Sequence, residues 1–350
     1  MTSNGKMRRA LLTGPRQIEF EEIPVGLPAP DEVLVRIHSC AICTWEKRAY
    51  TGADQRFYPL LGGHEISGVV EAIGEDAADD LEVGDHVSVS GLTRCGKCYS
   101  CRMGRDNRCD NTWQKGFKPG TPIGPGGLAT HKMAKAYQVF KVQADTDLVE
   151  VSLAEPLACV LRSIKKARVE AGDFVVVVGS GVMGVLHLML AKRRGATVIV
   201  SEPDEGRRQR ALDFGADHVL DPAEDDLVER VKEITGDRGA QEIFDAVGRG
   251  PILESAIGAL GKGGRLHVYA RVYPKGSTIS IDPNIFHEKE IVLTGTMSQS
   301  REDYLQAAEM IARHAIDLRP IISGTYPMDQ MKEAFEASTR LENYRIVVTM

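Results

Sequence analysis

Short runs of alternating or β-branched residues fill the first third of the chain. Clusters of Pro, Gly and Asp, such as the segment at 28–31, separate these runs. They predict strands at residues 9–12, 32–39, 68–73 and 86–89. Several short strands with turns between them are typical of a small barrel or sandwich, so we expect an all-β region here.

The middle third has a different rhythm, in which apolar runs alternate with helical segments. Predicted strands lie at 174–178, 197–200, 218–220, 242–245, 265–270 and 290–294, and predicted helices at 182–194, 206–214, 223–235 and 251–260. Six strands, most of them joined by helices, predict a doubly wound parallel sheet. Residues 296–350 contain one clear helix at 302–314 and a final strand at 345–349. They are too few to fold alone, and we expect them to pack onto the first region.

Composition and charge exclude several classes of function. A chain of 350 residues can form two domains, each with its own core. The formal charge of -6 and the lack of a basic run with interleaved aromatics argue against a nucleic-acid surface. No apolar stretch reaches the roughly 18 residues that a membrane span needs. The first residues include two arginines with no apolar signal core behind them, so we expect a cytoplasmic protein.

A glycine motif follows the first strand of the predicted parallel sheet. The segment Gly179-Ser-Gly181-Val-Met-Gly184 matches G-x-G-x-x-G and lies between a buried strand and a helix. Its first glycine permits a tight turn, the second lets the backbone approach a pyrophosphate, and the third allows close packing of helix and strand. The positive end of the helix would face the phosphates. The residues that we expect to contact the cofactor are Gly179, Gly181, Val182, Met183, Gly184, Glu202, Arg207 and Val247.

Glu202 ends the second strand of the same predicted sheet, 18 residues after Gly184. A carboxylate there can accept hydrogen bonds from the adenosine ribose hydroxyls and would repel a 2′-phosphate, which favours NAD over NADP. Arg207 and Arg208 weaken this interpretation slightly, because a nearby arginine can accommodate a 2′-phosphate.

Four of the seven cysteines stand close together, at Cys95, Cys98, Cys101 and Cys109. Four closely spaced thiolates suit a closed tetrahedral zinc site, whereas disulfides would need an export signal that the sequence does not show. A second set, Cys43 with the step Gly63-His64-Glu65, suits a metal site that is left open for chemistry. Cys40 could compete as a ligand, but we interpret it as a buried strand cysteine.

These motifs together resemble the zinc-containing medium-chain dehydrogenase/reductase (alcohol dehydrogenase) family, in its sorbitol (polyol) and threonine dehydrogenase-like branch. The resemblance covers essentially the whole chain. It implies a GroES-like β-barrel domain from residues 1–156 and 296–350, with a Rossmann domain at 157–295 between its parts. It also implies a homodimer or homotetramer.

The resemblance assigns ligands to two zinc ions. Cys95, Cys98, Cys101 and Cys109 correspond to the ligands of a structural zinc in a lobe at 95–109. Cys43, His64 and Glu155 correspond to the ligands of a catalytic zinc, and Glu65 could bind in place of a water. The expected reaction is hydride transfer from a secondary alcohol to NAD, with zinc as the Lewis acid.

The segment after Cys43 departs from the family's usual pattern, in which Gly, a hydroxyl residue and Asp follow the cysteine. Here the sequence reads Thr44-Trp45-Glu46-Lys47-Arg48. Glu46 can take the orienting role of the Asp, but Trp45 cannot relay a proton and Arg48 stays charged. Either Thr44, a substrate hydroxyl or Glu65 moves the proton, or the site has moved toward reducing a carbonyl or an imine.

The sequence therefore predicts an NAD-dependent zinc dehydrogenase that acts on a polyol, sugar or cyclitol. An NADPH-dependent carbonyl or imine reductase is the alternative, and a cofactor-binding protein without catalysis is a third hypothesis. The substrate pocket is expected to include Trp45, Phe57, Trp113 and residues near Met297.

Overall fold

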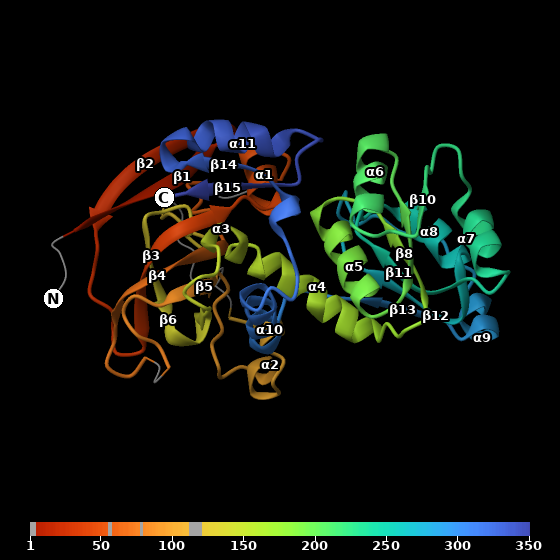
Figure 1. The fold of residues 1–350 in the computed structure, drawn as a ribbon, viewed down its shortest axis with the longest axis horizontal. Helices are drawn as coiled ribbons and strands as arrows, with labels where there is room; N and C mark the ends of the chain where they lie inside the picture. Colours follow the sequence, from red (N-terminus) through yellow and green to blue (C-terminus); the bar gives the residue numbers. More distant parts are fainter. Residues whose placement is uncertain (1–4, 55–57, 78–79, 112–120) are drawn as a thin grey trace. The chain divides into compact units, whose positions relative to one another are not determined.

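The computed structural model describes residues 5–54, 58–77, 80–111 and 121–350. Its contacts divide the chain into two compact units. Unit 1 comprises Met1–Ala158 and Gln299–Met350, and unit 2 comprises Cys159–Ser298 (Figure 1). Two distant parts of the sequence therefore build unit 1.

Unit 1 is built around a seven-stranded sheet. Its members are β3 (Glu32–Ala41), β4 (Glu65–Ile73), β5 (His86–Ser90), β6 (His131–Lys135), β7 (Val139–Lys141), β14 (Ile322–Pro327) and β15 (Arg345–Thr349). All its pairings are antiparallel except that of β14 with β15. The late strand β15 pairs with the early strand β3, so the two parts of the chain share one sheet. A separate hairpin joins β1 (Lys6–Gly14) to β2 (Gln17–Pro24).

Alternate residues of β3 contribute to the core cluster of unit 1. Val33, Val35 and Ile37 of β3 are buried, and they pack in one cluster with apolar residues of β5 and β15. Helices α1 (Thr44–Thr51) and α11 (Met331–Thr339) also contribute to it. Tyr50 and Phe335 bring these two helices together, with ring centroids 4.7 Å apart. Unit 1 also contains the helices α2 (Tyr99–Arg102), α3 (Leu148–Val151) and α10 (Arg301–Ala312).

Unit 2 is a parallel six-stranded sheet in the order β10-β9-β8-β11-β12-β13. Its strands are β8 (Phe174–Val178), β9 (Thr197–Ser201), β10 (His218–Leu220), β11 (Ala240–Asp245), β12 (Leu260–Val268) and β13 (Val292–Gly295). This is the doubly wound order 3-2-1-4-5-6, whose direction reverses between β8 and β11. The sheet confirms the predicted fold class for this part of the chain.

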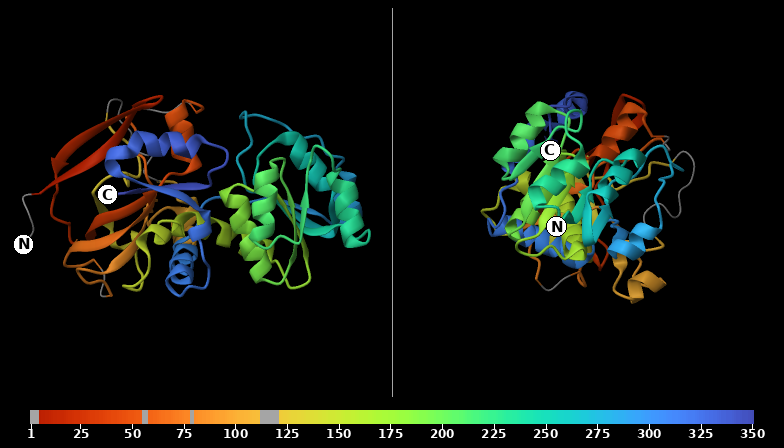
Figure 2. Two further views of the ribbon diagram at one scale, coloured as in Figure 1. Left: turned by 45° about the horizontal axis from the view of Figure 1, so that its top comes forward. Right: turned by 90° about the vertical axis from the view of Figure 1, so that its right-hand side faces the viewer.

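Helices cover both faces of this sheet, as Figures 1 and 2 show. One face carries α5 (Val182–Arg193) and α6 (Glu205–Asp213). The other carries α7 (Leu227–Thr235), α8 (Gly250–Gly258) and α9 (Asn284–Lys289). Helix α4 (Ala154–Ala167) contains the boundary between the two units. Among the described residues, no helix combines the length and apolar character needed to cross a bilayer.

Some predicted boundaries are wrong. The helix expected at 223–235 begins only at Leu227, because the Asp226 carboxylate caps it by accepting the N–H groups of Val228 and Glu229. The helix expected to reach residue 260 ends at Gly258, and β12 begins at Leu260. The predicted pattern also lacked the strands β2, β6, β7 and β14 and the helices α1, α2, α3, α4, α9 and α11.

Candidate active site

Three side chains that could hold a metal ion meet where β3, β4 and α1 come together. One ligand atom from each of Cys43, His64 and Glu65 lies within 4.8 Å of the others. The register of the sheet explains this, because Ala41 of β3 pairs with Glu65 of β4. Cys43, which follows β3 and directly precedes α1, therefore lies beside His64. A thiolate, an imidazole and a carboxylate are all zinc ligands, so this donor set fits zinc.

Glu46 holds the ring of His64 in place. Its Oε1 accepts hydrogen bonds from His64 Nδ1 at 2.7 Å and from the Gly63 N–H at 2.9 Å. The Glu46 side chain is fully buried. Because a carboxylate only accepts, Nδ1 carries a proton, and a metal would bind at Nε2 in place of any proton on that nitrogen. The glutamate thus makes the contact expected from the sequence.

Trp45 packs against the same imidazole. Its ring centroid is 5.9 Å from that of His64, and the two ring planes are nearly perpendicular at 87°. This edge-to-face contact puts a large side chain next to a metal-ligand candidate. Thr44, the first residue of α1, is exposed.

Arg345 of β15 pairs with Glu65 deep inside unit 1. Arg345 Nη2 is 2.9 Å from Glu65 Oε1, and both side chains are almost completely buried. Burial raises the pKa of Glu65 to about 7, although the charges of Arg345 and His64 oppose the rise. Sequence reasoning missed Arg345. The available signal was a charged residue at the start of the final strand, directly before the apolar run 346–348.

The pKa values of Cys43 and His64 are also shifted. Burial raises the pKa of Cys43, and the charge of Glu65 adds to this rise. Burial alone would lower the pKa of His64, but the charges of Glu46 and Cys43 outweigh it and raise that pKa well above its usual value. Burial therefore dominates the shifts of Cys43 and Glu65, whereas neighbouring charges outweigh burial at His64.

Glu155 and Cys40 lie outside this ligand group. Glu155 is buried near the start of α4, and its negative charge contributes to the raised pKa of Glu65 and of Arg345. Within the described part of the chain, the atoms that meet within 4.8 Å do not include those of Glu155. Cys40 is completely buried in β3, and its Sγ lies 2.8 Å from the position of a Cβ at Gly63.

The four clustered cysteines form the second ligand group. The Sγ atoms of Cys95, Cys98, Cys101 and Cys109 lie within 4.8 Å of one another, and all four are free thiols. Asn111 Nδ2 and the Cys98 N–H both donate to Cys95 Sγ at 3.3 Å. The Asn111 contact and the surrounding backbone N–H groups lower the pKa of Cys95 to about 6. Donors aimed at sulfur favour thiolates, and four thiolates suit a closed zinc site.

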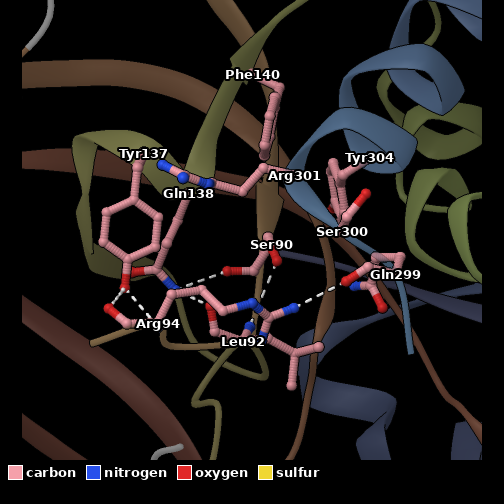
Figure 3. A pocket seen from close by; sticks show the side chains of 10 residues that line it. All are labelled: Ser90, Leu92, Arg94, Tyr137, Gln138, Phe140, Gln299, Ser300, Arg301 and Tyr304. Carbon is pink, nitrogen blue, oxygen red and sulfur yellow. Dashed lines mark hydrogen bonds between the residues drawn. The ribbon is translucent and has the colours of Figure 1, made fainter. Parts of the chain in front are cut away.

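Two arginines connect the lobe at 95–109 to the start of α10. Asp106 of the lobe lies between Arg94 Nε at 3.5 Å and Arg301 Nε at 3.2 Å. Arg94 Nη2 also donates to the Gln299 carbonyl at 2.9 Å. A small cavity beside these residues is shown in Figure 3, and Tyr137 forms part of its wall. The lobe is therefore fixed to the segment where the chain re-enters unit 1.

The glycine motif of unit 2 forms the turn between β8 and α5. Gly179 has φ +92°, a left-handed conformation that favours glycine. A Cβ on Gly184 would lie 1.8 Å from the Gly179 carbonyl oxygen, so no larger residue fits there. Gly181 has no atom within 4 Å of its Cβ position, which leaves its backbone open to a ligand. This turn fits a dinucleotide pyrophosphate.

Glu202 connects this turn to the end of β9. It is buried, with Oε2 accepting from the Ser180 N–H at 2.7 Å and Oε1 from the Asp204 N–H at 3.1 Å. Arg208 is committed elsewhere, because Nη1 donates to the carbonyls of Glu202 and Pro203 and Nη2 pairs with Asp221 at 2.9 Å.

The remaining predicted positions are less informative. Val247 follows β11 and packs against Gly179, with its Cγ2 2.6 Å from the Cβ position of that glycine. Met297 is 60% exposed. Phe57 and Trp113 lie outside the described residues.

Comparisons with known proteins agree with this geometry. The model of the alcohol dehydrogenase GroES-like domain matches residues 29–144, and that of the zinc-binding dehydrogenase domain matches residues 182–313. A 2-dehydro-3-deoxy-L-galactonate 5-dehydrogenase from Pseudoalteromonas atlantica is 34% identical over 88% of each chain. Sorbitol dehydrogenase from Bacillus subtilis is 27% identical over 96% of this chain and 95% of its own.

A solved structure has the same overall architecture. It is a Sinorhizobium meliloti protein bound to NADP, with a TM-score of 0.88, 25% identity and coverage of 99% of this chain and 100% of its own.

A sheet with a dinucleotide turn, joined to a domain with clustered metal ligands, defines a metal-dependent nicotinamide oxidoreductase. The family matches confirm the GroES-like and Rossmann assignments. The chain belongs to the zinc-containing medium-chain alcohol dehydrogenase family, and its activity is that of an alcohol oxidoreductase.

Proposed function

We propose that this protein is an NAD-dependent zinc dehydrogenase that oxidises a secondary alcohol in a polyol, sugar or cyclitol. The observation that carries the proposal is the grouping of Cys43, His64 and Glu65, supported by Glu46. The polyol and sugar-acid activities of the two curated relatives support the substrate class.

The residues of unit 1 would hold the catalytic zinc through Cys43 and His64, with Glu155 or Glu65 as an acidic ligand. Zinc bound there would act as a Lewis acid on the substrate oxygen, and the nicotinamide ring would accept the hydride. Glu46 keeps Nε2 of His64 available for the metal. Arg345 balances the charge of Glu65 in its buried surroundings.

A second zinc would occupy the lobe, bound by Cys95, Cys98, Cys101 and Cys109. Four thiolates leave that centre with a net negative charge, which the nearby Arg94 would partly offset. Arg94 already pairs with Asp106 next to this cluster. The role of this zinc is structural, because four protein ligands leave no position for a substrate.

The choice of NAD over NADP rests on Glu202. A buried carboxylate at the end of β9 would repel a 2′-phosphate, and each of its oxygens already accepts one backbone N–H. Arg208 is held by two carbonyls and Asp221, so it is not available to compensate. The NADP bound to the Sinorhizobium meliloti protein is the observation that favours the alternative, an NADPH-dependent carbonyl or imine reductase.

The proton released by the alcohol must be carried away by a residue other than Trp45. Trp45 packs against His64 and has no group that could accept a proton. Thr44, whose position is exposed at the start of α1, is our candidate for the first carrier. Thr44→Val should then lower turnover about 10²-fold, whereas wild-type turnover would exclude this route.

The enzyme would act as a homodimer or homotetramer through the edge strand β13. This strand ends the sheet of unit 2 and exposes Val292 by 44% and Leu293 by 37%. An unpaired strand edge is ready to pair with another chain, and here the partner would be a second copy.

The direct test uses purified, zinc-replete protein with NAD⁺ and NADP⁺ against polyols, cyclitols, sugar acids and simple secondary alcohols. We expect two zinc ions per chain, one for each ligand group. We also expect kcat/KM to favour NAD⁺ by at least about tenfold. A preference for NADP⁺ would favour the reductase, and zinc in the lobe alone would favour a protein without catalysis.

A further inference from the structure

Asp245 ends β11 beside the glycine turn, although it has no part in the cofactor contacts predicted from the sequence. It is completely buried, and it is the register partner of Val178 at the end of β8. The order of the sheet reverses between these two strands. Dinucleotides bind at such a reversal, beyond the carboxyl ends of the strands.

The Asp245 side chain holds the turn that follows β11. Its Oδ1 accepts hydrogen bonds from the N–H groups of Val247 and Gly248, both at 3.0 Å. Its backbone carbonyl accepts two more, from Tyr269 at 3.2 Å and Ala270 at 2.9 Å. One residue therefore connects this turn to the segment that follows β12. Aspartate commonly closes such a turn through its own side chain.

The turn after β11, which Asp245 holds, packs directly against the glycine turn between β8 and α5. Val247 Cγ2 lies 2.6 Å from the Cβ position of Gly179, so these two turns form one packed wall. The path of the backbone at Gly248 is equally tight, because a Cβ there would lie 2.3 Å from the Arg271 carbonyl oxygen. A shift of the Val247 turn would therefore change the wall beside the first glycine.

Keeping a carboxylate at this position has a cost. Burial raises the pKa of Asp245, and the two N–H groups only partly oppose that rise. Its other oxygen, Oδ2, has no hydrogen-bond partner among the described residues. A buried polar atom without a partner is unfavourable for folding. Stability alone therefore does not account well for this residue.

We propose that Asp245 is a positioning residue for the dinucleotide, which keeps Val247 against Gly179 and so preserves the shape of the cofactor site. The inference rests on the proposed function, because it requires a dinucleotide at the glycine turn. Asp245 acts through Val247 and does not touch the cofactor itself.

The test compares dinucleotide dissociation constants, measured by fluorescence titration with NADH and NADPH, for the wild type and two substitutions. Asp245→Ala removes the acceptor of both N–H groups and should weaken binding about tenfold or more. Asp245→Asn keeps a carbonyl acceptor at Oδ1 and should stay within about threefold of the wild type. At saturating cofactor, kcat should change less than the KM for the cofactor.

A matched control separates positioning from general stability. Asp226 makes the same kind of contact, accepting the N–H groups of Val228 and Glu229 at the start of α7. Asp226→Ala should lower the unfolding midpoint and leave the dissociation constant unchanged. Gly248→Ala provides a second route, since it displaces the turn while Asp245 stays in place, and it should also weaken binding.

Each outcome decides the matter. Unchanged affinity in Asp245→Ala, or in Gly248→Ala if the first variant does not fold, would overturn the proposal while wild-type binding keeps the proposed function. Equal losses in Asp245→Ala and Asp245→Asn would also overturn it, because charge rather than the turn would then matter. If the wild type binds neither dinucleotide, the proposed function and this inference both fail.

Discussion

The two ligand groups of unit 1 are built in opposite ways. The lobe takes all four thiols from a segment of fifteen residues, and backbone N–H groups of the same segment donate to their sulfurs. Cys43 follows β3, and His64 directly precedes β4. The carboxylate of the adjacent Glu65 pairs with Arg345 of β15, the last strand of unit 1. The lobe is therefore a local structure, whereas the group of Cys43, His64 and Glu65 is joined by a residue from the other end of the chain.

The two groups also differ in the charged side chains that surround them. The catalytic group combines a thiol, an imidazole and buried acids, and Arg345 stands among them. The lobe has four thiols, and at its border Asp106 pairs with Arg94 and Arg301. A site with mixed donors can leave a coordination position for substrate, whereas four thiolates close the site. Substitutions should accordingly affect chemistry in one group and stability in the other.

The largest effect is expected for His64→Ala. Removing this ligand should lower kcat by about 10³-fold or more, since the Lewis acid supplies several kcal/mol of transition-state stabilisation. Turnover and zinc content of the purified variant would test this, with the lobe zinc expected to remain. His218→Ala, at an exposed histidine, is the control. Near wild-type turnover in His64→Ala would remove the catalytic role of the group.

Cys98→Ser should have its main effect on stability. We expect loss of one zinc equivalent and a fall in the unfolding midpoint on the order of 10 °C, because binding of a structural zinc contributes to folding. Metal analysis and thermal unfolding would measure both quantities. Cys159→Ser is a suitable control, because Cys159 lies in neither ligand group. Unchanged metal content in Cys98→Ser would contradict the assignment of the lobe.

Glu46→Ala should lower turnover by about 10–100-fold, because His64 loses the carboxylate that orients its ring. Glu46→Gln retains an oxygen that can accept from Nδ1 and should lose less. Steady-state kinetics and zinc content of the two variants would separate orientation from metal binding. Equal turnover in all three proteins would mean that His64 needs no such support.

A partly buried histidine, His64, and a fully buried one, His187, offer a smaller test through the pH dependence of stability. His64 has an acid beside it, whereas burial without an acid partner lowers the pKa of His187 to about 3. The unfolded chain binds a proton at His187 below pH 6.5 and the folded protein does not, so its contribution to stability is present above pH 6.5 and is lost toward pH 3.

The wild type should therefore lose about 2 kcal/mol more stability than His187→Gln between pH 7 and pH 5. Denaturant midpoints at the two pH values would measure this, with His218→Gln as the exposed control. Identical slopes for the wild type and His187→Gln would show that His187 gains its proton in the folded state too.

Features built from neighbouring residues could be predicted from the sequence, whereas contacts between distant segments could not. The cysteine lobe and the glycine turn could be predicted because their residues are close together in the sequence. The spacing within Cys95–Cys109 is typical of a zinc site, and that within Gly179–Gly184 is typical of a dinucleotide-binding turn. The strands of unit 2 could be predicted from continuous apolar runs such as that of β8. Arg345 could not be paired with Glu65 in advance, because their contact depends on β15 joining β3 beside β4.

The position of Arg345 in β15 has a consequence for biosynthesis. As the chain emerges from the ribosome, Cys43, His64 and Glu65 appear long before the arginine that balances their acid. Until residue 345 has been made, Glu65 has no cation from β15 to accompany it into the core. The four cysteines of the lobe are therefore complete early in synthesis, whereas the surroundings of Glu65 are complete only after the final strand has joined its sheet.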